Sequence, residues 1–161
     1  MSVVRATTDQ AIDAVRAAGG GDLDLARRGL TTVQESIRRL SGVTGLDLSG
    51  NRLTSLPNWI GSLADLTRLD LSDNALSVLP DAIGDPTNLR ELRLKNTRIS
   101  ALPASIGKLT RLATLDVDYN QLTEPLAPSA TFGCPVCGRP TCDSWQIGMG
   151  VSQEGLAVTA C

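Results

Sequence analysis

Residues 43–57 read VTGLDLSGNRLTSLP, and the phrase returns as LTRLDLSDNALSVLP at residues 66–80 and LRELRLKNTRISALP at residues 89–103. A fourth copy begins at Leu112, so the period is 23 residues throughout. An aliphatic residue fills the fourth, sixth and eleventh positions of every copy. A fixed period of about 20–29 residues is typical of proteins built from stacked structural repeats. We therefore expect each copy to form one turn of a solenoid.

The pattern inside each turn has a physical reading. Leu46 and Leu48 alternate with polar residues, so they share one face of a short strand. One repeat is too small to bury this face alone, and stacking on its neighbours stabilises by roughly 1.5–3 kcal/mol per buried leucine. Asn51, Asn74 and Asn120 follow the strands. Their amides are predicted to bond the backbone of adjacent turns, with a weaker rung where Thr97 replaces asparagine.

The N-terminal region predicts a helix over Thr7–Ala18. Thr7 and Gln10 form a capping box, and Gly19 begins a glycine run that ends the helix. The expected apolar stripe is Ala11, Ala14, Val15 and Ala18, with Ile12 beside it. We expect residues 1–19 to cap the solenoid. Five turns then begin near residues 20, 43, 66, 89 and 112 and occupy residues 20–126, the first being degenerate as end repeats commonly are.

The consensus LxxLxLxxNxLxxLPxxIxxL over residues 20–126 resembles the leucine-rich-repeat family, in the subtype of cytosolic Ras-associated scaffolds and many bacterial intracellular proteins. The resemblance implies an α/β fold, in which the solenoid is a right-handed arc with a parallel inner sheet. It further implies a concave surface that grips a partner protein, and no catalytic activity.

Side chains that alternate with the buried leucines point to the concave face, and equal offsets form columns across strands about 4.8 Å apart. One column is acidic except for Arg93, which lies between Asp70 and Asp116 and would relieve their repulsion. A basic stripe on the fourth of the five turns, which begins near residue 89, crosses the face: Arg90, Arg93, Lys95 and Arg98. The predicted partner-binding residues are Arg68, Asp70, Asp73, Glu91, Arg93, Lys95, Asn96, Asp116, Asp118 and Tyr119.

Two interpretations of this face stand side by side. Its mixed charge selects a complementary partner by electrostatics, or aspartate is simply the usual family residue at this offset and Arg93 compensates it. A calcium site is disfavoured, because the spacing offers single oxygens and not a shell of six to eight. On the convex side, Trp59 is expected to lie over neighbouring side chains more readily than to anchor a partner.

The C-terminal tail, residues 127–161, differs in composition and is expected to be poorly structured. It holds all four cysteines: Cys134, Cys137, Cys142 and Cys161. The segment from Cys134 to Cys137 resembles half of a zinc-ribbon or rubredoxin-like site. Since the chain has no histidine, the other two cysteines would have to complete it. One hypothesis is therefore a zinc-binding tail.

A second hypothesis comes from the abundance of serine, threonine and cysteine. The tail resembles the core of a lanthipeptide, a ribosomal peptide whose dehydrated Ser and Thr residues accept cysteine thiols. The repeats would then act as leader for a modifying enzyme, and the acceptors would be Ser129, Thr131, Thr141, Ser144, Ser152 and Thr159. A third reading is a flexible tail with free thiols, or one that lies over the last repeat.

Composition excludes several functions. A net charge of −2 over 161 residues gives no general attraction to nucleic acid or an anionic membrane. No apolar run approaches a membrane span of about 18 residues, and Met1–Gly20 carries charges in place of a signal peptide. The lack of histidine excludes Ser-His and Cys-His catalysis. The sequence thus predicts a cytoplasmic, non-catalytic protein-interaction module with no catalytic residues, and no cofactor besides the zinc of the tail hypothesis.

Overall fold

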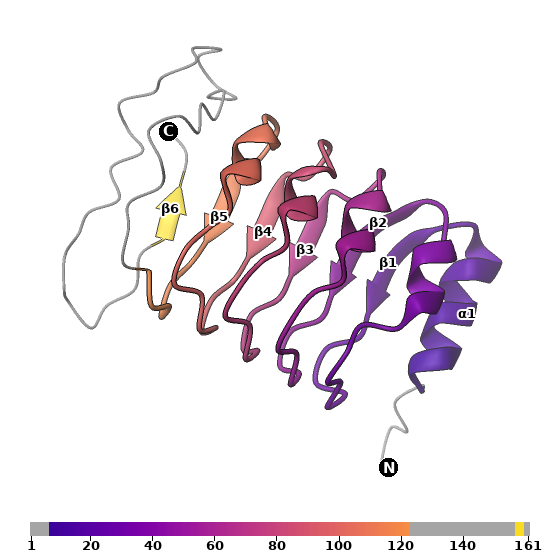
Figure 1. Cartoon of the computed structure of the whole chain (residues 1–161). Helices are drawn as coiled ribbons and strands as arrows, with labels where there is room; N and C mark the ends of the chain where they lie inside the picture. The colour runs from indigo at the N-terminus through magenta and orange to yellow at the C-terminus, as the bar shows by residue number, and fades with distance from the viewer. Residues whose placement is uncertain (1–6, 123–156, 160–161) are drawn as a thin grey trace.

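The computed structural model describes residues 7–122 and 157–159 and shows a solenoid of successive coils (Figure 1). One wall is a sheet whose strands lie side by side in chain order. The strands are β1 (Gly21–Asp24), β2 (Val43–Asp47), β3 (Arg68–Asp70), β4 (Glu91–Arg93), β5 (Thr114–Asp116) and β6 (Ala157–Thr159). β1 to β5 are parallel, and from β2 to β5 each residue pairs with the one 23 positions later. The α/β repeat solenoid is confirmed.

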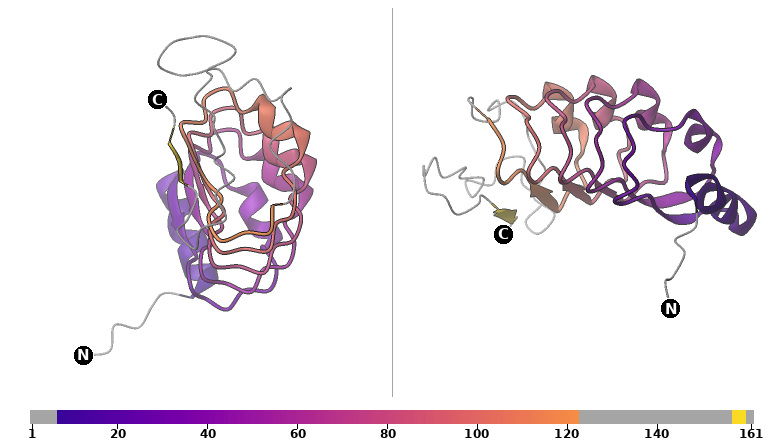
Figure 2. Two further views of the ribbon diagram at one scale, coloured as in Figure 1. Left: turned by 90° about the vertical axis from the view of Figure 1, so that its left-hand side faces the viewer. Right: turned by 90° about the horizontal axis from the view of Figure 1, so that it is seen from below.

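Short 3₁₀ helices form the opposite wall, so each coil passes from strand to helix and back (Figure 2). They are η1 (Glu35–Arg39), η2 (Asn58–Ser62), η3 (Asp81–Gly84) and η4 (Ala104–Lys108). Pro57, Pro80 and Pro103 directly precede the last three helices, with φ angles of −74°, −69° and −67°. Proline fixes this angle and lacks a backbone donor, so it suits the entry to a helix. The Leu-Pro pairs therefore mark where each coil turns into its outer wall.

The core lies between the two walls and consists of aliphatic side chains. On the side of the sheet, Leu48, Leu71 and Leu94 are fully buried at equivalent positions of three successive coils. Ile60, Ile83 and Ile106 meet them from the helices: each is at most 1% exposed. Trp59 is partly buried against this core, as expected for a convex side chain lying over its neighbours. The repeat register read from the sequence is confirmed.

Asn51 shows how asparagine ties adjacent coils together. Its amide Oδ1 accepts hydrogen bonds from the backbone nitrogens of Arg28 and Leu30, each at 3.0 Å. Its Nδ2 donates to the carbonyls of Leu25 at 2.9 Å and Leu48 at 2.7 Å. The side chain is only 7% exposed, so these bonds satisfy backbone groups that water does not reach. The predicted asparagine ladder is confirmed.

The rung at Thr97 is weaker, as predicted. Its hydroxyl has one hydrogen to donate and lies within bonding reach of two acceptors, the carbonyl of Leu94 at 3.1 Å and Oδ1 of Asn120. Asn74, by contrast, reaches back 26 residues to the carbonyl of Leu48 at 3.0 Å. Within residues 7–122, Thr97 makes no such bond to the preceding coil. At this junction the ladder residue itself therefore adds no hydrogen bond to the preceding coil.

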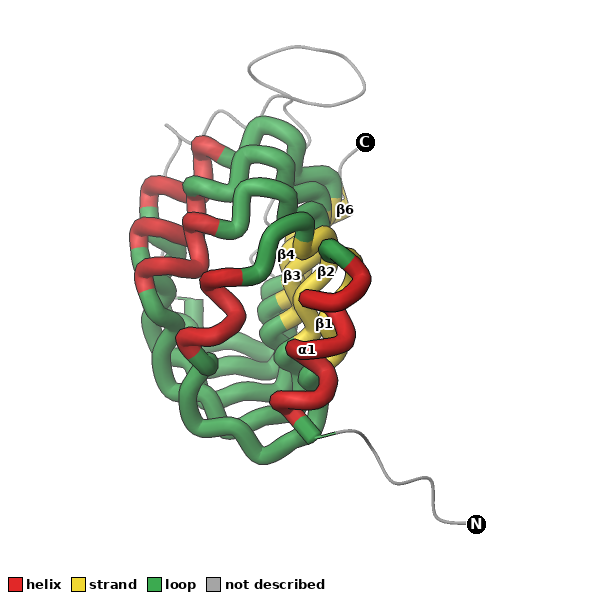
Figure 3. The backbone as a smooth tube through the Cα atoms, turned by 90° about the vertical axis from the view of Figure 1, so that its right-hand side faces the viewer, coloured by secondary structure: helices red, strands yellow, loops and turns green. Residues whose placement is uncertain are grey.

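The N-terminal helix α1 (Thr8–Ala18) lies beside β1 at the first coil (Figure 3). Its capping box is present: Thr7 and Gln10 exchange bonds of 2.8 and 3.3 Å. The predicted apolar stripe is confirmed at Val15 and at Ile12 beside it, which are the buried residues, and it is wrong at Ala14 and Ala18, which are exposed. A helix with one neighbouring coil needs only a narrow contact line, which two large side chains fill.

The last strand departs from the parallel pattern. β6 pairs with β5 in the antiparallel direction, with Leu115 opposite Val158. Residues 157–159 belong to the tail, which was expected to be poorly structured. The reading in which the tail lies over the last repeat allowed such a contact, whereas the pairing with β5 itself was not predicted. The outer edge of β5 explains it, since unpaired N–H and C=O groups along a sheet edge accept any strand that can reach them.

The outer wall also has a steric requirement at Gly84, which ends η3. A Cβ atom built on Gly84 would lie only 2.0 Å from the backbone oxygen of Ser105 in η4. At Gly61 of η2 the equivalent separation, to the oxygen of Ala82, is 2.7 Å. Backbone atoms cannot move away as a flexible side chain can. The spacing of the helices thus depends on these glycines.

Thr97→Asn is expected to raise the free energy of unfolding by about 1 kcal/mol. The amide would bond the backbone of the preceding coil in the way Asn74 does, which the threonine hydroxyl does not. Urea unfolding of the variant and of the reverse change, Asn74→Thr, measures the effect. A less stable Thr97→Asn protein would contradict the ladder model.

Gly84→Ala is expected to lower the free energy of unfolding by about 1–3 kcal/mol, the usual cost of forcing atoms into a packed interior. The added methyl group would displace η4 from η3. Gly61→Ala is the graded comparison, and its cost should be smaller because the available space is larger. Thermal unfolding of both variants and of the unaltered protein ranks the three by stability. Equal stability of all three would contradict the steric requirement at these glycines.

Candidate partner-binding surface

The inner face of the sheet holds a shallow hollow of about 290 Å³. It is bounded by charged residues from four adjacent strands, which are Asp22, Asp24, Asp47, Arg68, Asp70, Glu91 and Arg93. These positions alternate with the buried leucines, because successive side chains of a strand point to opposite faces. The period that buries the leucines therefore also brings these charges together.

One ion pair spans two strand spacings across the hollow. Arg68 on β3 bonds the carboxylate of Asp22 on β1. Between them, on β2, stands Gly45, where a Cβ would lie 2.5 Å from Oδ1 of Asp22 and 3.1 Å from Nη2 of Arg68. The missing side chain leaves the space in which the pair forms. Sequence reasoning missed this pair, although the glycine in a column of larger residues was the available signal.

Arg93 also has a partner that the sequence did not foresee. The strand register does place it between Asp70 and Asp116. Its guanidinium, however, lies 2.5 Å from Oε1 of Glu91 and 3.7 Å from Oδ2 of Asp70. No pair with Asp116 is present in the described part of the chain, which corrects the sequence prediction. Glu91 lies two residues away on the same face of β4, so the short distance favours it.

The aspartate column has a structural role. Oδ1 of Asp24, Asp47 and Asp70 accepts a hydrogen bond of 2.9 Å from the backbone nitrogen two residues later. Asp116 makes the same bond at 3.1 Å. Such a bond is the usual way in which aspartate ends a strand and begins a turn. The interpretation of aspartate as a standard residue at this offset thus accounts for Oδ1 of each carboxylate, whereas Oδ2 of Asp70 lies near Arg93.

The next turn residues adopt the left-handed conformation. Asp73, Asn96 and Tyr119 have φ angles of 55°, 53° and 54°. Nδ2 of Asn96 donates to Oδ1 of Asp73 at 2.7 Å, so these two predicted site residues form a pair along their column. Tyr119 is 57% exposed, and Nζ of Lys95 lies 5.3 Å from its ring centre, a cation–π contact. The structure therefore brings four of the predicted residues together as two pairs.

Asp118 differs from its predicted neighbours because it is buried, with 8% of its surface exposed. Its Oδ1 has no hydrogen-bond partner within the described residues. Burial raises the pKa of the Asp118 carboxyl, the nearby Asp116 carboxylate raises it further, and Lys95 acts in the opposite direction. Asp118 was expected on an open face, and its burial could not be read from the alternation of side chains.

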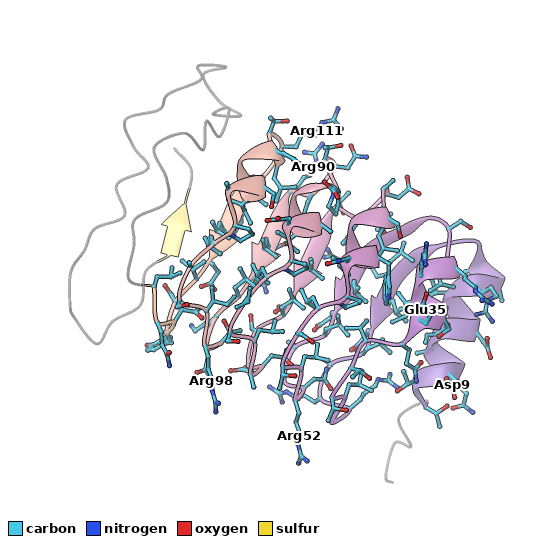
Figure 4. All side chains as sticks on the ribbon, in the orientation of Figure 1. Asp9, Glu35, Arg52, Arg90, Arg98 and Arg111 are labelled. Carbon is cyan, nitrogen blue, oxygen red and sulfur yellow. The ribbon has the colours of Figure 1, made fainter. Side chains whose placement is uncertain are left out.

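The basic stripe of the fourth repeat is divided. Arg93 and Lys95 belong to the inner face, whereas Arg90 and Arg98 project at opposite edges of the solenoid (Figure 4). These edges flank the strands, so the two outer arginines are available to ligands that never enter the hollow. The stripe predicted from the sequence is therefore three separate positive regions.

The tail hypotheses concern residues outside the part of the chain that the structure describes. These are the zinc ligands Cys134, Cys137, Cys142 and Cys161 and the modification sites Ser129, Thr131, Thr141, Ser144 and Ser152. Of Thr159 only the backbone, in β6, is described. Within the described ranges, no group of three or more acidic, cysteine or histidine residues is arranged to hold a metal ion. No helix there has the length and apolarity needed to cross a bilayer.

Asp118→Asn is expected to stabilise the protein at neutral pH. A raised pKa in the folded state means that folding disfavours the charged form, and this penalty is present when the pH is above that pKa. The penalty disappears as the pH falls below the ordinary value of 3.8, because the carboxyl is then neutral in both states. Urea unfolding at pH 7 and at about pH 3 should show a gain only at the higher pH. A gain of equal size at both would rule out this origin.

Comparisons with known proteins were made for sequence and structure. A family model described as leucine rich repeat matches residues 22–76 and 66–122. A leucine-rich-repeat protein of Leptospira interrogans is similar at 27% identity with a TM-score of 0.54, over 73% of this chain and 41% of that one. A chain from the BIR3–SERK2 complex of Arabidopsis thaliana has 34% identity and a TM-score of 0.60, over 67% of this chain and 60% of that one.

This chain thus spans less than two thirds of either solved structure. The search of curated proteins gives no match. The two family matches together cover most of the described solenoid and run through β1 to β5. The chain belongs to the leucine-rich-repeat family.

Proposed function

We propose that the protein is a non-catalytic interaction module that holds a partner protein on the concave face of its sheet. Membership of the leucine-rich-repeat family supports a protein-binding role. One of the similar structures, from the BIR3–SERK2 pair, was itself determined as a protein complex. The observation that carries the proposal for this chain is the charged hollow across β1 to β4.

The charges of the hollow are only partly balanced. Arg68 is engaged by Asp22, and Arg93 is engaged by Glu91. Asp47 and its neighbour Asp24, which face each other across β1 and β2, make no ion pair within residues 7–122. Their turn bonds use Oδ1, and both residues line the hollow.

The residual charge of the hollow is therefore negative, and its unpaired carboxylates lie on β1 and β2. A partner that places a lysine or arginine there would meet two carboxylates whose own positions are fixed by backbone bonds. Such fixed charges lose little conformational entropy on binding, and they favour partners of complementary charge over others. The partner is expected to present a basic side chain to this hollow.

The remaining predictions concern the C-terminal tail, the cellular location and the partners other than a protein. Zinc binding and lanthipeptide-like modification stay predictions, because nothing in the described residues favours either. The cytoplasmic location, the absence of nucleic acid or membrane as partner and the involvement of a modifying enzyme stay predictions as well.

The variant Asp24→Asn combined with Asp47→Asn tests the proposal. Asparagine keeps the turn-forming oxygen and removes the charge, so the fold should be retained. Affinity capture from a lysate of the cells that make the protein, quantified by mass spectrometry, identifies a partner of the unaltered chain. Titration calorimetry should then show affinity reduced by about tenfold or more for the variant, with a weaker dependence on salt.

Asp81→Asn is the matched control, because it removes one carboxylate from the first turn of η3 on the opposite wall. It should leave affinity unchanged. A partner that binds the double variant and the unaltered protein equally well would contradict binding in the hollow.

A further inference from the structure

A second hollow, of about 370 Å³, lies outside the inner face of the sheet. Two columns of residues that are equivalent in successive repeats line it. One column lies where the chain enters the strands, and the other lies just before that point in the sequence. The first column supplies Thr44, Thr67 and Arg90, and the second supplies Asp65, Asn88 and Arg111. Arg90 and Arg111 lie near each other at the same edge of the solenoid (Figure 4). The 23-residue period thus gathers two arginines that are 21 positions apart in sequence.

Most polar groups around this hollow are already engaged. The hydroxyl of Thr67 donates to the carbonyl of Thr44 at 2.8 Å, and the hydroxyl of Thr44 donates to Asp22 at 3.0 Å. Nδ2 of Asn88 donates to the carbonyl of Ala64 at 2.9 Å. These bonds fix the threonines and the asparagine and leave them little capacity for a ligand.

The two guanidinium groups are different. Arg111 donates one N–H to Oδ1 of Asn88 at 2.6 Å, which holds its side chain toward the preceding turn. A guanidinium has five donors in a planar fork, so most of them remain available. Within residues 7–122, neither Arg111 nor Arg90 forms an ion pair, although Asp65 lines the same hollow. Two positive groups therefore face one space without a counter-charge in contact.

We propose that Arg90 and Arg111 form a binding site for an oxyanion, a carboxylate or a phosphate group, at the edge of the sheet. Planar guanidinium groups bind both oxyanions through paired N–H···O bonds. Asn88 is a positioning residue, since it orients Arg111 through its own oxygen. Asp65 opposes the ligand electrostatically. The site is separate from the acidic hollow of the inner face and is selective for the opposite charge.

The test uses the full chain labelled with ¹⁵N and follows the arginine side-chain Nε–H signals. Sodium pyrophosphate and a tri-glutamate peptide are titrated separately at constant ionic strength. The signals of Arg90 and Arg111 should shift to saturation. The double variant Arg90→Gln and Arg111→Gln should weaken binding by about tenfold or more, and Asp65→Asn should strengthen it.

The matched control is Arg52→Gln with Arg98→Gln, which removes the same charge at the opposite edge (Figure 4). It should leave binding unchanged. Saturation by the peptide alone assigns the site to carboxylates, saturation by pyrophosphate alone assigns it to phosphates, and saturation by both supports a general oxyanion site. Shifts that never saturate, or equal weakening by both double variants, would overturn the proposal.

Discussion

The asparagine that follows β2, β3 and β5 is the constraint on which the rest of the structure depends. Where a coil leaves the sheet, its backbone loses strand partners while it is still buried. The amide of Asn51 fills this need with two accepted bonds and one donated bond to the preceding coil, and it donates a further bond within its own coil to Leu48. Packed leucines alone have no direction and tolerate sliding. The buried amides fix the register, and with it the position of every charged side chain on the inner face.

The sequence predicted what the period controls. Buried leucines, the ladder, its weak rung at Thr97 and the capping box at Thr7 all follow from residue type at a fixed offset, so they could be read without coordinates. The choice of Glu91 as a partner for Arg93 depends on side-chain rotamers and distances within one strand, which the period does not determine. The burial of Asp118 and the pairing of β6 depend on the end of the solenoid, where the repeating environment stops.

Negative and positive side chains gather on different faces of the molecule. The inner hollow keeps unbalanced carboxylates, whereas arginines project from both edges of the sheet (Figure 4). A net charge of −2 hides this division, because the two signs nearly cancel over the whole chain. Close fields of opposite sign orient an approaching partner more effectively than a uniform surface does. The two fields can therefore orient an approaching partner even where each single contact with it is weak.

The antiparallel direction of β6 has a consequence for assembly. A parallel sheet built from identical coils offers its last strand to any further coil, including one from another molecule, since the hydrogen-bond pattern is the same at each step. β6 reverses that pattern at β5, so a neighbouring molecule would meet a strand running the wrong way for continued stacking. At the other side of the sheet α1 lies beside the first coil, so a coil from another molecule would have to displace α1 to stack on β1.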